Sequence, residues 1–179
     1  MPDIMDVLKE LDKEYGISNI PDGAYQVALG ENTKEYPGKD GGQANFRFGW
    51  KVINGEYTGR ELGDFLRWHP DTDGLDREAA TKRVKASRGS VTSMFNMAAA
   101  SLPEEVQPQL ANAIVGIRDS ESADEANAQF AVVAELARPY VFTVRAVTNQ
   151  SGYQNVRYME KGHTIEAPIT DEQLAAVAV

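Results

Sequence analysis

The sequence contains no cysteine and only two histidines, His69 and His163, among its 179 residues. The absence of thiols excludes disulfides and thiolate metal sites, and it fits a reducing cytoplasm. No apolar run approaches the roughly 18 residues that a membrane-spanning helix needs. The first residues show neither the basic region nor the apolar core of a secretory signal. We therefore expect a cytoplasmic protein without a membrane-spanning segment.

Motifs for catalysis or cofactor binding are also scarce. The glycine-rich segment 38–42 has neither the spacing nor the Lys-Ser/Thr ending of a phosphate-binding loop. His69, Asp71 and Asp73 lie within five residues, but the third acid and the distal glutamate of a calcium loop are missing. A turn from a strand into a helix explains this cluster equally well. We predict no enzyme, no metal site and no cofactor.

The chain is acidic overall, with a formal net charge of −9, but its charges are segregated. Residues 1–40 and 104–139 each carry a net charge of −5. Residues 76–88 carry five bases against two acids, and residues 140–159 carry two bases and no acid. Because the local field governs where a polyanion docks, this distribution is compatible with nucleic-acid binding. Ordinary solvated surface charge is the alternative interpretation.

Two blocks of the sequence have the periodicity of helices. In the first, Asp3 is a candidate N-cap of a helix. The apolar residues of this helix recur at helical spacing, namely Ile4, Val7, Leu8, Leu11 and Tyr15. The block 71–139 predicts a helix up to about residue 87, an interruption at Gly89, and further helices headed by capping boxes at Ser101 and Ser122.

The stretch 45–52 alternates strictly between two kinds of residue, which predicts a strand. One face is apolar and is predicted to lie in the core; it consists of Phe46, Phe48, Trp50 and Val52. The other face is polar and positive, and it consists of Asn45, Arg47, Gly49 and Lys51. Further strands are predicted near residues 25–29, 60–69, 140–147 and 153–159. The polar, glycine-rich segment 33–42 is expected to be a loop.

Three strands, a helical block and two more strands follow the order of an OB-fold, a five-stranded Greek-key barrel. We predict one domain of this mainly β class, with an N-terminal helix and a helical insertion between strands three and four. Its expected segments are the N-terminal helix (1–16), strands one to three (20–70), the helical insert (71–139), strands four and five (140–160) and a C-terminal tail (161–179). The insert is far longer than the usual connection, and it could build a second lobe or supply a dimer surface.

Barrels of this kind bind oligonucleotides on the face of strands two and three and with two neighbouring loops. Arg47 and Lys51 would lie on that face, and Lys34 and Lys39 in the first loop. The predicted nucleic-acid interface is completed by side chains for stacking or phosphate contact, namely Phe65, Arg67, Arg145, Tyr153 and Arg157. Packing or plain exposed surface is the alternative for each of them.

The pattern leaves open which aromatic side chain would stack on bases. Asp64 falls between the apolar positions Leu62 and Leu66, so the register of this strand is ambiguous, and a bulge would resolve it. The candidates for stacking are Phe65, Trp68, Tyr153 and the loop residue Tyr36.

Two stretches resemble a family of bacteriophage and prophage single-stranded DNA-binding proteins. Residues 21–27 fit that family's opening P-x-G-x-Y-x-V strand, and residues 55–62 fit its G-E-Y-x-G-R-x-L hairpin. The resemblance covers residues 20–70 and, less closely, 140–160. It implies an OB-fold protein that coats single-stranded DNA without sequence preference during phage replication or recombination, in the cytoplasm of the host. It also implies replication or recombination proteins as partners, but the tail 161–179 lacks the acidic run closed by an aromatic that many such proteins use for recruitment.

A protein-interaction module is the second hypothesis. The acidic amphipathic first helix and the alanine-rich insert would suit basic protein partners or self-assembly. An inhibitor or assembly factor on the same scaffold would look similar, because a fold does not determine a function.

Overall fold

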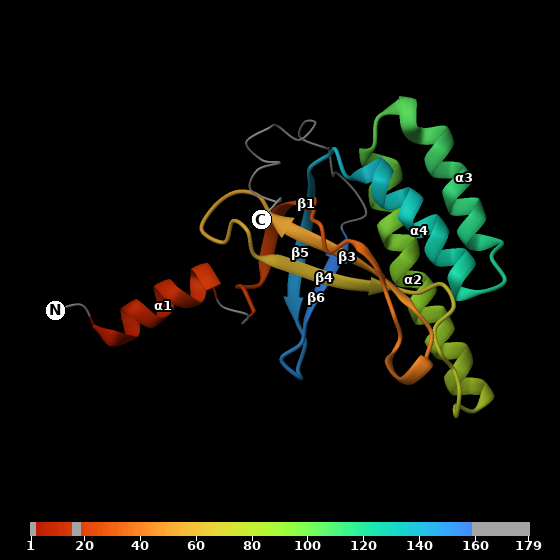
Figure 1. The fold of residues 1–179 in the computed structure, drawn as a ribbon, viewed down its shortest axis with the longest axis horizontal. Coiled ribbons are helices and arrows are strands. Elements are labelled where there is room, and N and C mark those ends of the chain that lie inside the picture. The colour runs from red at the N-terminus through yellow and green to blue at the C-terminus, as the bar shows by residue number, and fades with distance from the viewer. Residues whose placement is uncertain (1–2, 16–18, 159–179) are drawn as a thin grey trace.

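The structure, a computed structural model, describes residues 3–15 and 19–158 of the chain. It begins with helix α1 (Ile4–Tyr15), and Asp3 caps it as predicted, accepting a hydrogen bond from the Met5 amide at 2.8 Å. Figure 1 shows α1 at one end of the molecule, away from the sheet and the other helices. The predicted tail 161–179 lies outside the described residues.

Six antiparallel strands form one open sheet: β1 (Gly23–Leu29), β2 (Lys34–Tyr36), β3 (Asn45–Val52), β4 (Glu61–Leu66), β5 (Phe142–Thr148) and β6 (Gln154–Tyr158). One edge of β3 pairs with β1 and β2, and its other edge pairs with β4. On the far side of β1, β5 pairs with β1 and β6 pairs with β5. The described parts of β4 and β6 lie side by side but share no strand ladder.

The five predicted strands are present, and the prediction missed one. β2 is only three residues long and lies in the segment 33–42 that was expected to be a loop. Its residues are polar and do not alternate with apolar ones, so the sequence carries no strand signal there. A short 3-10 turn, η1 (Lys39–Gly41), follows it before β3.

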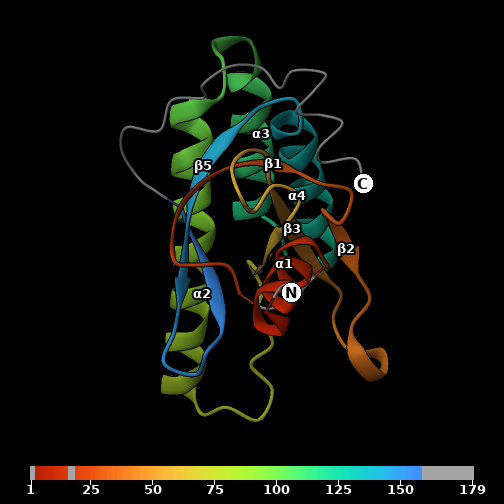
Figure 2. The same cartoon turned by 90° about the vertical axis from the view of Figure 1, so that its left-hand side faces the viewer.

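Three helices and a short turn make up the predicted insertion: α2 (Arg77–Ser101), η2 (Glu104–Val106), α3 (Gln107–Arg118) and α4 (Ala123–Ala137). In Figures 1 and 2 these helices pack together on one side of the sheet. Ser122 caps α4 as predicted, because its hydroxyl accepts a hydrogen bond from the Glu125 amide. The Glu125 carboxylate accepts its hydrogen bond from the Glu121 amide, one residue before the one that a capping box uses. The box expected at Ser101 is wrong, since that residue lies inside α2.

The interruption expected at Gly89 does not occur, because α2 continues through this residue for 25 residues in all. A glycine inside a helix costs only about 1 kcal/mol relative to alanine. Burial of Val91, Met94 and Phe95 just after it contributes more than that. Packing therefore outweighs the local preference.

The sheet and the helical insertion share one hydrophobic core. Phe46, Phe48, Trp50 and Val52 are buried as the alternation of β3 predicts. The ring of Phe130, on α4, stacks on Phe46 with centroids 6.0 Å apart and meets Phe48 edge-on at 6.1 Å. The insertion is therefore packed onto the sheet and does not form a separate lobe. Across the described part of the chain, no helix is long and apolar enough to cross a bilayer.

Candidate nucleic-acid interface

The outer face of β2, β3 and β4 brings predicted site residues together in two cross-strand rows. Lys34 lies opposite Arg47, and Arg47 lies opposite Phe65. In the next row Tyr36 lies opposite Asn45, and the Asn45 amide oxygen accepts a hydrogen bond from Arg67 Nε at 2.6 Å. We call these side chains the sheet-face cluster: Lys34, Tyr36, Arg47, Phe65 and Arg67.

An aromatic pair lies at the centre of the sheet-face cluster. The rings of Tyr36 and Phe65 meet edge-on with centroids 6.0 Å apart, and 41% of Phe65 is exposed. The Lys34 ammonium lies 5.5 Å from the Tyr36 ring centre, and the Arg67 guanidinium carbon lies 5.4 Å from that of Phe65. Burial lowers the pKa of Arg67 from its ordinary value, and the nearby Asp64 carboxylate opposes this shift. The cluster thus combines exposed aromatic surface with cations.

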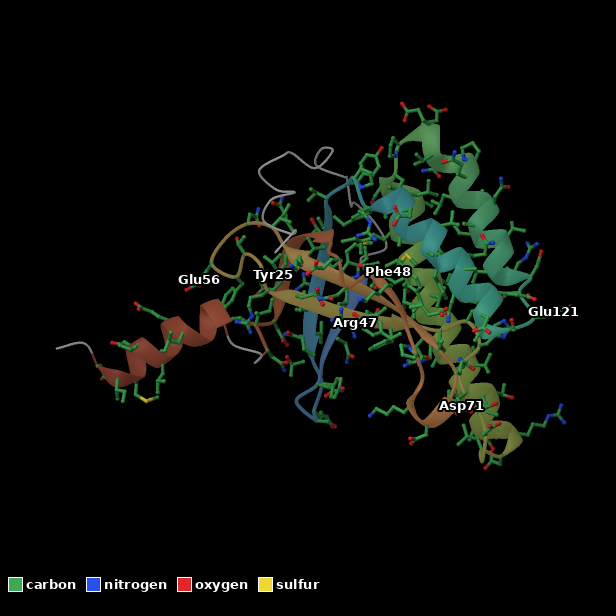
Figure 3. The ribbon with its side chains drawn as sticks, in the orientation of Figure 1. Tyr25, Arg47, Phe48, Glu56, Asp71 and Glu121 are labelled. Atoms are coloured by element: carbon green, nitrogen blue, oxygen red, sulfur yellow. The ribbon has the colours of Figure 1, made fainter. Side chains whose placement is uncertain are left out.

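Arg47 does not extend into solvent as the strand alternation suggested. Its guanidinium makes an ion pair with Glu61 at 2.5 Å, and only 20% of its side chain is exposed. The guanidinium lies over Gly63 and beside Gly49, which face each other across β3 and β4. A side chain at Gly63 would overlap the guanidinium, so the glycine leaves the room that Arg47 occupies. Figure 3 shows Arg47 among the strands of the sheet.

A groove with a volume of about 1090 Å³ opens beside the sheet-face cluster. Its floor is formed by residues 64–66 of β4 and by residues 67, 70 and 71 of the segment that follows, and one wall is the loop from Tyr36 to Gln43. The opposite wall is the first half of α2. Figure 2 shows this loop and the start of α2 on opposite sides at the same end of the molecule. The loop wall carries Lys39, a predicted site residue.

Asp64 resolves the ambiguous register of this strand without a bulge. β3 and β4 pair in a regular register, and Asp64 accepts a hydrogen bond from the Tyr158 hydroxyl of β6 at 2.9 Å. That hydroxyl in turn accepts a hydrogen bond from Trp50 Nε1 at 3.1 Å. Burial raises the pKa of Tyr158 well above its ordinary value. The hydroxyl therefore stays protonated and is the donor of the hydrogen bond to Asp64. The chain of hydrogen bonds explains how a carboxyl group can share a face with Leu62 and Leu66.

Replacing Asp64 by asparagine is expected to make the protein more stable, relative to the unchanged protein, at neutral pH than at acid pH. Burial raises the pKa of Asp64, and the Tyr158 hydrogen bond and the charges of Arg67 and Arg47 oppose this only in part. Stabilisation from a raised pKa is present at acid pH and is lost as the pH rises through the folded-state value. Asparagine stays neutral and still accepts the hydrogen bond from Tyr158. The free energy of unfolding of the variant, relative to the unchanged protein, should therefore rise from acid to neutral pH in urea titrations. Parallel pH profiles would contradict this account.

The other predicted site residues are not part of the two cross-strand rows of the sheet-face cluster. Lys51 is only 5% exposed, and its aliphatic stem packs closely over Gly30. Arg145 and Arg157 face each other across β5 and β6, at the end of the strand order opposite β2, and both are exposed. Tyr153, 74% exposed, lies in the turn between these two strands. These last three residues form a separate exposed patch, which we call the β5–β6 patch.

Lys82 and Arg83 line the groove from α2, although neither was among the predicted site residues. The excess of five bases over two acids in residues 76–88 was the available signal. This excess of bases does not show on which face of a helix each basic residue lies. Only the fold shows that Lys82 and Arg83 line the groove.

His69 has a structural role in the described structure. Its Nε2 lies 3.0 Å from the Ser120 carbonyl oxygen and 2.9 Å from the Ser120 hydroxyl, which links the segment after β4 to the turn between α3 and α4. Within residues 3–15 and 19–158, no group of three or more metal-ligating side chains comes together. In the segment itself the Asp73 amide donates a hydrogen bond to the Asp71 carboxylate at 2.9 Å, and Asp76 caps α2 just after it, as in a turn from a strand into a helix.

Comparisons of the chain with protein-family models, with curated proteins and with solved structures found no match.

Proposed function

We propose that the protein binds single-stranded DNA without sequence preference, on the outer face of β2, β3 and β4. The observation that carries this proposal is the pair of the exposed Phe65 ring and the half-buried Tyr36 ring, with Arg67 and Lys34 beside them. Aromatic faces stack on any base, and cations neutralise the phosphates between the bases. Such a surface binds a polynucleotide without reading its sequence, and it involves no catalysis.

The strand connections support an OB-fold as the scaffold of this function. β1 pairs with β3 and β5, β3 with β4, and β5 with β6, which are four of the five contacts in a five-stranded barrel. The fifth contact would join β4 to β6, and the hydrogen bond between Tyr158 and Asp64 lies between these strands. On this scaffold the sheet-face cluster occupies the oligonucleotide-binding face of strands two and three. The resemblance to phage single-stranded DNA-binding proteins supports the same function, in replication or recombination.

Fluorescence anisotropy of a labelled oligo(dT) tests the proposal. A strand of about 30 nucleotides exceeds the site size of 4–16 nucleotides per OB-fold. We expect tight binding at low salt, with log K falling against log salt by about 0.7 for each phosphate contact. Duplex DNA of equal length should bind much more weakly, and an oligo(rU) arm measures the preference between DNA and RNA. Absence of binding to the single strand even at low salt would contradict the proposal.

Lys34→Glu is the charge reversal to combine with this titration, because Lys34 is an exposed cation of the sheet-face cluster. Reversing Arg47, Lys51 or Arg67 would break an ion pair or a hydrogen bond, or place a carboxylate in a buried or half-buried position, so lost binding could reflect lost folding. Arg118→Glu is a matched control, because Arg118 is exposed on α3 and its partner is the neighbouring residue Asp119. Binding should weaken in the first variant and stay unchanged in the second.

A protein-interaction module is the second candidate function, and α1 is the observation that favours it. The side chains of Ile4, Val7, Leu8 and Leu11 are exposed on this acidic helix. An isolated helix of 12 residues is marginal in water, and most helices gain their stability from packing of an apolar face. If this were the protein's only function, the oligo(dT) titration would show no binding.

A further inference from the structure

We propose that the first half of α2 is a phosphate-binding wall, so that a single strand runs through the groove between α2 and the sheet-face cluster. This inference rests on the proposed function and extends its site to the helical insertion. Bases would stack on Phe65 and Tyr36, while the phosphates would meet Lys82 and Arg83 across the groove.

One face of the first half of α2 lines the groove. Lys82, Arg83, Ala86, Ser87 and Ser90 line the groove with one more residue, Ala79. Apart from the two cations these side chains are small, so the wall offers space beside its positive charge. The groove-lining part of α2 carries no acid.

Two hydrogen bonds and a cation–π contact join α2 to the segment after β4. The Ser87 hydroxyl donates a hydrogen bond to the Arg67 carbonyl at 2.5 Å, and Arg88 Nε donates one to the Trp68 carbonyl at 2.9 Å. The Arg88 guanidinium also lies over the Trp68 ring, 4.6 Å from its centre. These contacts join α2 directly to Arg67 at the floor of the groove and to Trp68 just after it. The helix is therefore attached to the segment that carries Phe65 and Arg67, which suits a single strand held between them.

Arg83 lines the groove beside the segment between β4 and α2. Its Nη1 donates a hydrogen bond to the Asp71 carbonyl at 3.0 Å, which orients the guanidinium along the segment between β4 and α2. A guanidinium has five N–H donors in a planar fork that matches phosphate geometry. The hydrogen bond to Asp71 uses one of them, and Arg83 remains exposed. Lys82, also exposed, adds a second cation one residue away.

The decisive experiment compares two double variants of α2 in the oligo(dT) titration. Lys82→Glu/Arg83→Glu reverses the charges of the groove wall. Arg77→Glu/Lys85→Glu makes the same change in net charge on the same helix, outside the groove; Lys85 lines a separate hollow on the other side of α2. Lys82→Gln/Arg83→Gln removes the two cations without adding repulsion. Far-UV circular dichroism and a urea unfolding curve verify that each variant is folded.

We expect the glutamine variant to reduce the salt slope of log K by about 1.4, which corresponds to two lost phosphate contacts at about 0.7 each. The glutamate variant should weaken binding further, and the Arg77/Lys85 control should retain the slope of the unchanged protein. Equal slopes for the glutamine variant and the unchanged protein would overturn the inference. That failure is distinct from failure of the proposed function, because binding to oligo(dT) would persist and would still depend on Phe65.

Discussion

Replacing Phe65 by alanine is expected to weaken the binding of single-stranded DNA while leaving the protein folded. Stacking of a base on an aromatic ring contributes about 1–3 kcal/mol, which corresponds to a roughly 5- to 150-fold rise in Kd. The ring is 41% exposed and lies outside the shared core, so the free energy of unfolding should change little. Anisotropy titrations give the first quantity, and urea unfolding gives the second.

Two comparisons make this result specific. Phe65→Trp keeps a stacking surface and should bind as well as the unchanged protein. Tyr153→Ala removes the exposed ring of the β5–β6 patch and should leave the affinity unaltered. If affinity were lost in Tyr153→Ala and retained in Phe65→Ala, the binding surface would lie on β5 and β6, and the proposed surface would be wrong.

Replacing Phe130 by alanine should have the reverse effect, with a large loss of stability that reaches both the sheet and the helices. Phe130 is fully buried, and its ring contacts Phe46 and Phe48 of β3 and Phe95 of α2. Removing a buried phenylalanine ring typically costs about 3–5 kcal/mol, because a cavity is left where the ring packed. We expect the midpoint of urea unfolding to fall accordingly.

The Phe130 variant also tests whether the insertion and the sheet unfold together. Tryptophan fluorescence reports mainly on Trp50 in the sheet and Trp68 after it, and far-UV circular dichroism reports mainly on the helices. The urea midpoints of the two signals should fall by the same amount, since one core joins the sheet and the insertion. Val132→Ala on the same helix is the control, because Val132 is 40% exposed and should cost little. Two separate transitions, with only the helical signal affected, would show that the insertion is an independent unit.

The parts of the fold that the sequence predicts are those with a strong periodic signal. The alternation in residues 45–52 identifies β3 and its buried face, because one face of a strand repeats every second residue. The capping residues Asp3 and Ser122 mark the starts of two helices. β2 escapes prediction because three polar residues carry no period, and their pairing with β3 is a long-range contact.

The candidate site is only partly accessible from sequence for a related reason. Alternation places Arg47 and Lys51 on the outer face of β3, but it does not reveal what else lies on that face. Glu61 pairs with Arg47, and Lys51 is buried beside Gly30. Conversely, the proximity of Tyr36 to Phe65, and of α2 to both, depends on the pairing of β2, β3 and β4 and on the docking of the insertion. These are properties of tertiary packing that no single stretch of sequence contains.

The location of the bound strand can be measured directly by NMR. Titration of the isotopically labelled protein with a short oligo(dT) would map backbone amide shifts onto the fold. The account predicts that the largest changes occur in residues 34–36, 45–47 and 63–67, with further changes at residues 82 and 83. Shifts concentrated instead on β5 and β6, or no shifts at saturating oligo(dT), would contradict a binding surface on β2, β3 and β4.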